Sequence, residues 1–291
     1  GPWGLNRHMS NAAKGALWMI AAAGALTAMA VCIRYLPAYS VLLMIFLRNV
    51  INLVLMAPSL LRQGTQMVKT GRLGTHALRN AFLYGGNVAW FYGVTLIALA
   101  DVASLQFTSP LFTALIAAAF LGERIGGHRL IAIVVGFAGA LIIIRPGVIP
   151  INLGTVMILI AAFLYSCAHV VTKRLSDTES GSTVVFYMSV TILVYSAIPA
   201  FFVWQTPAWA DMPAMIGLGI TGYATHYCIT RSLAKGDASF VIAFDFMRLP
   251  FSAILGWLLF REILDIWTCA GALIIFAAGY YSTVSEAKKT G

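Results

Sequence analysis

Ten long apolar stretches follow one another along the 291-residue chain, separated by short polar connections. Within each stretch the apolar residues continue without the alternation that the strands of a membrane barrel show, so helices are expected. Each stretch is close to the ~20 residues that a helix needs to cross the hydrocarbon core of a bilayer. The expected helices cover residues 15–33, 39–61, 77–97, 102–121, 129–145, 152–172, 182–204, 212–231, 239–260 and 264–283.

The composition of the chain indicates the same class. Apolar residues make up 60% of the chain and charged residues 10%. Soluble domains hold roughly one half and one quarter, respectively. The ten helices use nearly the whole chain and leave no room for a soluble domain. We therefore expect an all-α polytopic membrane protein with ten transmembrane helices.

The pattern contains one five-helix unit twice. Aligning Gly15 with Gly154 and keeping the offset places Glu123 opposite Glu262, so one spacing relates both ends of the unit. An odd number of crossings makes the second copy enter the membrane from the opposite side, as in the inverted repeats of many secondary transporters. The expected units are residues 9–149 and 150–291.

The first eight residues differ in character from the rest. Gly1-Pro2 resembles the remnant of a cleaved tag and His8-Met9 resembles a cloning junction, so residues 1–8 are expected to be a tag remnant. The first apolar stretch is long enough to span a membrane and has no convincing cleavage site after it. We expect this stretch to stay in the membrane.

The positions of Lys and Arg predict the orientation. If the amino terminus is inside, thirteen of them lie at cytoplasmic ends and three at the other ends, which favours cytoplasmic termini in a bacterial inner membrane. Basic loops that contact anionic lipids also explain the net charge of +9 without a nucleic-acid partner. The thirteen are Lys14, Arg62, Lys69, Arg72, Arg79, Arg124, Arg129, Lys173, Arg174, Arg231, Lys235, Lys288 and Lys289, and the three are Arg34, Arg145 and Arg261.

Several helices carry polar and aromatic residues three or four positions apart, which places them on one face. Hydrogen bonds between helices or anchoring at the membrane surface are alternative roles. Polar groups at membrane depth are costly unless they are paired or face water, so their clustering favours a shared cavity. On the third helix, Gly85, Ala89 and Gly93 form a separate stripe suited to close packing. The candidate cavity residues are Tyr84, Asn87, Trp90, Phe91, Gln106, Tyr165, His169, Tyr223, His226 and Tyr227.

The ninth helix carries two charges, Asp245 and Arg248, in an otherwise apolar stretch. Their three-residue spacing lets them pair, and each unpaired charge would cost about 3 kcal/mol at a helix centre. A structural ion pair is the first interpretation, and a proton-coupling carboxylate at Asp245 is the alternative. Pro110 and Pro250 follow polar residues in equivalent helices, which indicates either paired hinges near a midplane site or tolerated kinks.

Arg48 is the other charge deep in a predicted span, with Asn49 and Asn52 nearby. It can pair with Asp245, with backbone carbonyl groups, or with the carboxylate of a substrate. The sequence alone leaves these three possibilities open.

Several kinds of site are excluded by their missing motifs. Cys32, Cys167, Cys228 and Cys269 are scattered without a CxxC spacing, so neither a metal nor a cofactor is expected. No GxxxxGK[ST], HExxH or GxSxG motif is present, which argues against an ATP-driven pump and against an enzyme. Secondary transport is the class that remains favoured.

Two segments resemble a known family. Residues 103–110, ASLQFTSP, lead to Leu121-Gly122-Glu123-Arg124, and residues 245–250, DFMRLP, lead to Arg261-Glu262-Ile263. Together with the repeat they resemble the EamA-like branch of the drug/metabolite transporter superfamily over nearly the whole chain. Within it the chain is most similar to bacterial inner-membrane exporters associated with aromatic amino acids. Arg261 departs from the glycine of the usual Leu-Gly-Glu ending.

The resemblance implies that the first, third, fourth, sixth, eighth and ninth helices surround a central cavity, with the fifth and tenth peripheral. It also implies alternating access between two inverted EamA-like repeats. An aromatic cavity with few charges suits a zwitterionic solute. The expected function is export of aromatic or other neutral amino acids and related metabolites by a monomer in the lipid bilayer. An efflux carrier for drugs or organic cations, with Asp245 as its carboxylate, and a passive channel or lipid scramblase remain alternatives.

Overall fold

The computed structural model describes residues 2–235 and 241–290, with side chains for residues 11–235 and 241–285. Residue 1 of the expected tag remnant and the start of the expected ninth helix, residues 239 and 240, lie outside these ranges. The regular elements among the described residues are all helices. The helices are α1 (Pro2–Arg34), α2 (Val41–Gln63), η1 (Gly64–Val68), α3 (Leu73–Leu96), α4 (Leu99–Gln106), α5 (Ser109–Phe120), α6 (Gly127–Ile144), α7 (Leu153–Leu175), α8 (Gly181–Phe202), η2 (Trp209–Asp211), α9 (Met212–Lys235), η3 (Ile242–Met247), α11 (Arg248–Phe260) and α12 (Ile266–Thr290).

The fourth and ninth expected helices are each divided in two. Phe107 and Thr108 separate α4 from α5, and the tight helix η3 gives way directly to α11. Pro110 is the second residue of α5 and Pro250 the third of α11. Proline has no N–H to donate, so it is tolerated in a first turn, where backbone donors have no partner within the helix. Each proline therefore lies in the first turn of a new segment.

The expectation of ten spans is consistent with the helix lengths. Among the described residues, eight segments are long and apolar enough to cross a membrane, with α4–α5 and η3–α11 each counted as one. The other two spans are α3 and α9, of 24 residues each. At 1.5 Å per residue, such a helix is about 36 Å long. Polar residues such as Asn87 and His226 lower the mean hydropathy of these two helices.

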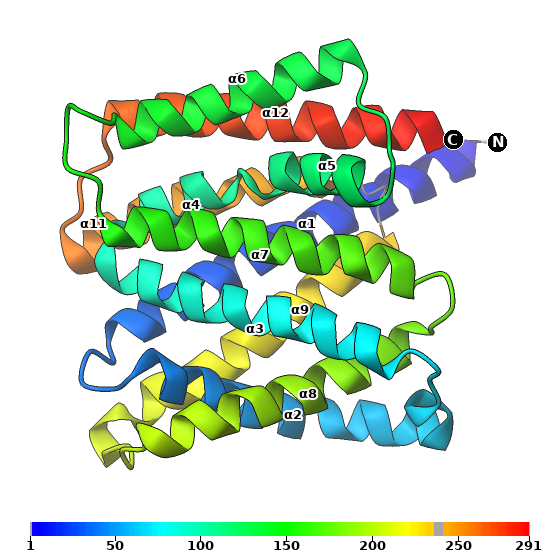
Figure 1. Ribbon diagram of the computed structural model, residues 1–291, viewed down its shortest axis with the longest axis vertical. Coiled ribbons are helices and arrows are strands. Elements are labelled where there is room, and N and C mark those ends of the chain that lie inside the picture. The colour runs from blue at the N-terminus through cyan, green and yellow to red at the C-terminus, as the bar shows by residue number, and fades with distance from the viewer. Residues whose placement is uncertain (1, 236–240, 291) are drawn as a thin grey trace.

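The packing of the helices follows a two-fold relation between the halves (Figure 1). If the second half repeats the first, α7 corresponds to α1, α8 to α2, α9 to α3 and α12 to α6. The pair α1–α9 is then equivalent to α7–α3, and both pairs are in extensive contact. Likewise α4 and α5 pack on α7, and their equivalents η3 and α11 pack on α1. The contacts α2–α8 and α6–α12 each join a helix to its own equivalent in the other half. This is the packing expected of an inverted five-helix repeat.

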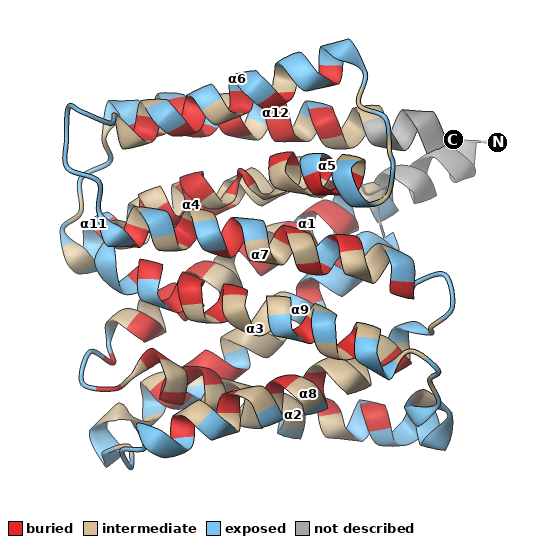
Figure 2. Ribbon diagram, in the orientation of Figure 1, coloured by how far each residue is buried: buried red, intermediate tan, exposed pale blue. Residues whose placement is uncertain are grey.

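Burial shows which helices are peripheral. Figure 2 shows buried residues where helices face one another and exposed residues along the outside of α6. The exposed positions of α6 include Leu130, Ile131 and Val134. A strip of exposed aliphatic side chains on a membrane helix is suited to contact with lipid. The α6–α12 pair lies along one edge of the bundle, as expected for the fifth and tenth spans (Figure 1).

The small-residue stripe of α3 lies at its contact with α7. A Cβ atom added at Gly93 would come within 2.3 Å of the side chain of Ile158, and one at Gly85 within 3.2 Å of Leu164. A side chain at Gly93 would therefore force the helices apart. The prediction of close packing on this face is confirmed.

Candidate functional site

A central cavity of about 350 Å³ lies between the two halves. This volume is within the range of small-molecule sites in proteins. Its walls come from seven helices, α1, α2, α3, α4, α7, α8 and α9. The lining residues are Leu26, Met29, Arg48, Asn49, Asn52, Leu83, Asn87, Trp90, Gln106, Tyr165, Met188, Ile192, Gly222, Thr225, His226 and Ile229.

The cavity receives part of each predicted stripe. On α3, Leu83, Asn87 and Trp90 line it, whereas Tyr84 packs beside Tyr195, their ring centroids 6.4 Å apart. Phe91 is fully buried behind the wall. The predicted face and the observed face both contain Asn87. They differ by a small rotation of α3 about its own axis, less than the angle between two successive residues. Residue spacing alone does not resolve that rotation.

Similar rotations affect α7 and α9. Tyr165 lines the cavity, but His169, one turn further along α7, is exposed. On α9 the cavity is lined by His226 together with Gly222 and Thr225. Tyr223 and Tyr227 instead line a neighbouring groove.

Two hydrogen bonds join polar side chains of the cavity wall. The hydroxyl of Tyr165 donates to Oδ1 of Asn87 at 2.7 Å, and the indole N–H of Trp90 donates to Oε1 of Gln106 at 2.8 Å. These bonds connect α7 to α3 and α3 to α4. Each ring thus keeps its polar atom paired while its apolar face remains available for stacking.

Arg48 lies on the cavity wall, and its contacts exclude one interpretation from the sequence. Its Nη2 lies 3.4 Å from Oδ1 of Asn49, its Nη1 lies 3.9 Å from the sulfur of Met29, and the guanidinium lies 5.2 Å from the ring centroid of Phe91. None of these contacts is with Asp245. Asn49 and Asn52 also line the cavity. The sequence indicated these two residues only through their position near Arg48 in an apolar span. The second helix was not among those expected to surround the cavity.

Asp245 and Arg248 form an ion pair, with Nη2 of Arg248 3.0 Å from Oδ2 of Asp245. The guanidinium also lies 5.0 Å from the ring centroid of Phe107 at the break between α4 and α5. Arg248 lines a small pocket beside the central cavity, and Trp90 and Gln106 are shared by both. The ninth span thus borders the cavity through this pocket, while the wall itself includes α2 and α8.

The two ends of the cavity differ. At the end where α1 stops, Nη1 of Arg34 lies 3.4 Å from Oε1 of Glu262, and the same guanidinium donates to the carbonyl groups of Val94 and Ile97. These bonds tie the end of α1 to the end of α3 and to the connection that follows α11. Toward the other end, a groove of about 320 Å³ lies between α2, α8 and α9, and His226 lines both groove and cavity. The site therefore extends toward the end where α1 begins and α12 finishes (Figure 1).

Comparison with known proteins identifies the family. A model of the EamA-like transporter family matches residues 13–145 and again residues 152–284. The chain belongs to the EamA-like transporter family. The two matches correspond to the two halves that the helix packing relates.

Named relatives of this EamA-like chain are transporters of small molecules. It is 28% identical over 243 residues to an S-adenosylmethionine uptake transporter of Rickettsia felis, covering 84% of this chain and 83% of the relative. It is 30% identical over 289 residues to a riboflavin transporter of Vibrio cholerae, covering 95% of each. Neither name is that of an aromatic amino acid exporter, so these matches support the family without the narrower likeness. A crystal structure with 16% identity has the same fold, with a TM-score of 0.65 over 94% of this chain and 98% of the other.

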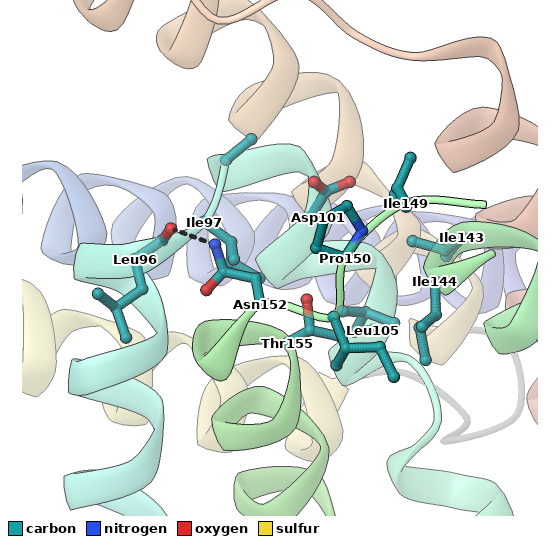
Figure 3. Close-up of a pocket in the computed structure, with 12 residues that line it drawn as sticks. Leu96, Ile97, Asp101, Leu105, Ile143, Ile144, Ile149, Pro150, Asn152 and Thr155 are labelled. Carbon is teal, nitrogen blue, oxygen red and sulfur yellow. Dashed lines mark hydrogen bonds between the residues drawn. The ribbon is translucent and has the colours of Figure 1, made fainter. Parts of the chain in front are cut away.

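A second pocket of the EamA-like chain, of about 340 Å³, lies where α3 ends, α4 begins and the α6–α7 connection crosses (Figure 3). Nδ2 of Asn152 donates to the carbonyl of Leu96 at 3.4 Å. Asp101 accepts a hydrogen bond of 2.7 Å from Thr268 on α12. The sequence-predicted site residues do not line this pocket, which leaves the central cavity as the candidate transport site.

Proposed function

We propose that this protein exports amino acids, aromatic or otherwise neutral, and related metabolites across the bacterial inner membrane. The substrate occupies the central cavity, and the two halves expose it alternately to either side. The observation that supports this is the lining: the rings of Trp90 and Tyr165, amide groups, Thr225, His226 and one arginine among apolar residues, in about 350 Å³. Aromatic faces stack on an apolar side chain, while the polar groups bond the charged ends of a zwitterion.

The relatives support a substrate of this kind in part. S-adenosylmethionine, the substrate in the name of one relative, carries an amino acid group, a positively charged sulfonium and an aromatic adenine ring. Riboflavin, in the name of the other, is aromatic but has no such group. The aromatic side chains of the cavity wall suit both compounds. The polar side chains of the wall determine whether a substrate with an amino acid group is preferred.

The helix arrangement supports alternating access. An inverted repeat gives a bundle two related conformations, each closed at one end. In this structure the Arg34–Glu262 pair ties α1 to the connection that follows α11 at one end, while the groove around His226 lies toward the other. The breaks before Pro110 and Pro250 provide points at which the fourth and ninth spans can bend. We propose that a monomer with cytoplasmic termini performs the cycle.

The cation-efflux alternative is less favoured by the cavity. A proton-coupled carrier of organic cations needs a free carboxylate in the membrane, and Asp245 is occupied by Arg248. Among the described lining residues there is no Asp or Glu to neutralise a cation that lacks a carboxylate of its own.

Counterflow into proteoliposomes tests the proposal. Vesicles containing purified protein are loaded with one unlabelled compound and given the same compound in labelled form outside. The panel contains the twenty amino acids, S-adenosylmethionine, riboflavin and two organic cations. Saturable, trans-stimulated uptake of at least one amino acid is expected. Uptake of organic cations alone would contradict the proposal, and unsaturable flux of all compounds would indicate a channel.

A further inference from the structure

Arg48 carries a positive charge without a neutralising partner in the described structure. The carboxylates of Asp245, Glu262 and Asp265 pair with other arginines, and no described carboxylate pairs with Arg48. Its contacts are a sulfur atom, an amide oxygen and the face of Phe91. A charge at membrane depth is costly unless it pairs or faces an aqueous cavity, and such residues mark substrate paths.

Two amide atoms beside Arg48 also lack partners. Nδ2 of Asn49 and Oδ1 of Asn52 are buried, and neither forms a hydrogen bond. Both residues line the same cavity as Arg48, one and four positions further along α2. Leaving a buried polar atom unpaired costs free energy, and two such atoms beside an arginine without a described carboxylate partner in one cavity point to a ligand with charged groups. Here the unmatched groups are one donor and one acceptor.

We infer that Arg48, Asn49 and Asn52 bind the amino acid group of the substrate. This inference rests on the proposed function and specifies which wall of the cavity makes it selective. Both amide atoms are shielded from the cavity in this conformation, so the side chains of Asn49 and Asn52 turn toward the substrate when it binds. The guanidinium of Arg48 and the N–H of Asn49 then donate charge-assisted hydrogen bonds to the carboxylate. The free oxygen of Asn52 accepts from the ammonium group. Trp90 and Tyr165 contribute to the same cavity from other helices and contact the side chain of the substrate.

This arrangement explains how one cavity can discriminate sharply between ligands of similar size. A site built to bond a charged group rejects an analogue that lacks it, because the polar atoms of the protein are then left unpaired. An aromatic compound without a carboxylate would leave the guanidinium of Arg48 without a neutralising partner. The carboxylate is therefore expected to matter more to binding than the identity of the ring.

The first test uses analogues against the unmodified, full-length protein in proteoliposomes. Unlabelled L-phenylalanine should compete for counterflow of labelled L-phenylalanine and of labelled S-adenosylmethionine. L-phenylalaninamide, which lacks the carboxylate, and N-acetyl-L-phenylalanine, which lacks the ammonium group, should each compete at least tenfold less well. Equal competition by the amide overturns the inference but leaves amino acid transport standing. Counterflow of riboflavin with no amino acid or S-adenosylmethionine exchange overturns both.

The second test removes the charge. Arg48→Gln should lower L-phenylalanine counterflow at least tenfold and abolish the preference for L-phenylalanine over its amide. Arg62→Gln removes the same charge from the exposed end of the same helix and should leave both unchanged. An Arg48→Gln protein that keeps counterflow and preference within twofold overturns the inference.

Because Arg48→Gln can also impair folding, a third variant fills the site from within. Asn49→Asp keeps the shape of the side chain and places a carboxylate where Oδ1 now lies 3.4 Å from Nη2 of Arg48. This variant should be at least as thermally stable as the unmodified protein and lose L-phenylalanine counterflow at least tenfold, since its own carboxylate occupies the guanidinium. A stable Asn49→Asp protein with normal counterflow overturns the inference.

Discussion

Gly122 and Arg261 occupy equivalent positions in the two halves and share a left-handed backbone, with φ of 69° and 54°. Gly122 follows α5 and Arg261 follows α11, so each ends the second segment of a divided span. The equivalence extends the two-fold relation from helix packing to a single dihedral angle. It also identifies Arg261 as a residue in a conformation that favours glycine.

Arg261→Gly is therefore expected to stabilise the fold. A side chain at positive φ costs about 1–2 kcal/mol, and the greater freedom of glycine in the unfolded chain offsets part of the gain. We expect a net increase of about 0.5–1 kcal/mol in the free energy of unfolding, measured by SDS titration in mixed micelles. Gly122→Ala should lower it by a similar amount. A loss of stability in Arg261→Gly would show that its side chain makes a contact worth more than the backbone strain.

The Arg34–Glu262 pair is expected to hold one end of the cavity closed. Its side chains are 15% and 21% exposed, so a contribution of about 1 kcal/mol is reasonable. Glu262→Gln should then make a cysteine at Asn52 react about fivefold faster with an impermeant thiol reagent applied from that end. Asp265→Asn is the matched control, because its 2.7 Å pair with Arg145 joins the peripheral helices α6 and α12 instead. Equal acceleration in both variants would argue against a specific closing role.

The orientation in the membrane can be tested with two cysteines. The predicted topology places the 62–76 connection in the cytoplasm. Thr65 is exposed there, whereas Thr70 bonds Glu179 and is a poorer reporter. In a background without native cysteines, Thr65→Cys should react with an impermeant reagent only in inverted vesicles. Gln205→Cys, exposed between α8 and α9, should react only in intact cells. The reverse pattern would contradict the positive-inside assignment.

The sequence alone predicted the helices better than it predicted the faces that they present. Apolar runs identify the spans because a helix in contact with lipid must be predominantly apolar along its length. The offset between the repeats likewise predicted the equivalence of Glu123 and Glu262. The face that a helix turns toward the cavity is harder to predict. Asn87 belongs equally to a stripe with Tyr84 and to one with Trp90, and only the packing of α3 against α7 selects between the two. The surroundings of Arg48 depend on helices distant in sequence, so residue spacing could not reveal them.

Aromatic residues of the cavity wall should matter more for transport than those elsewhere. Tyr165→Ala or Trp90→Ala removes a ring from the wall and should weaken substrate binding by about 1–3 kcal/mol, seen as a higher half-saturation concentration in counterflow. Trp209→Ala alters a side chain that is 90% exposed and should leave it unchanged. Tyr84→Ala, behind the wall beside Tyr195, should lower thermal stability more than affinity. Equal losses of affinity in all four would argue against this cavity.

The Asp245–Arg248 pair distinguishes a structural role from a coupling role. If the pair is structural, Asp245→Asn or Arg248→Gln alone leaves the opposite charge buried and lowers thermal stability. The double variant should then recover much of the loss, because neither charge remains unpaired. Arg248 is the more buried partner, with 11% of its side chain exposed against 33% for Asp245. Asp245→Asn should therefore be the more damaging single change, since it strands the more buried charge.

A coupling role for Asp245 predicts a different result. Asp245→Asn would then fold normally, lose uptake driven by a pH gradient, and keep counterflow, because exchange requires no net proton movement. The 3.0 Å contact with Arg248 favours the structural role, since the carboxylate of Asp245 is already engaged by the guanidinium. Thermal unfolding, counterflow and pH-driven uptake, measured on the same three variants, separate the two. A stable Asp245→Asn protein that lacks only pH-driven uptake would assign proton coupling to Asp245.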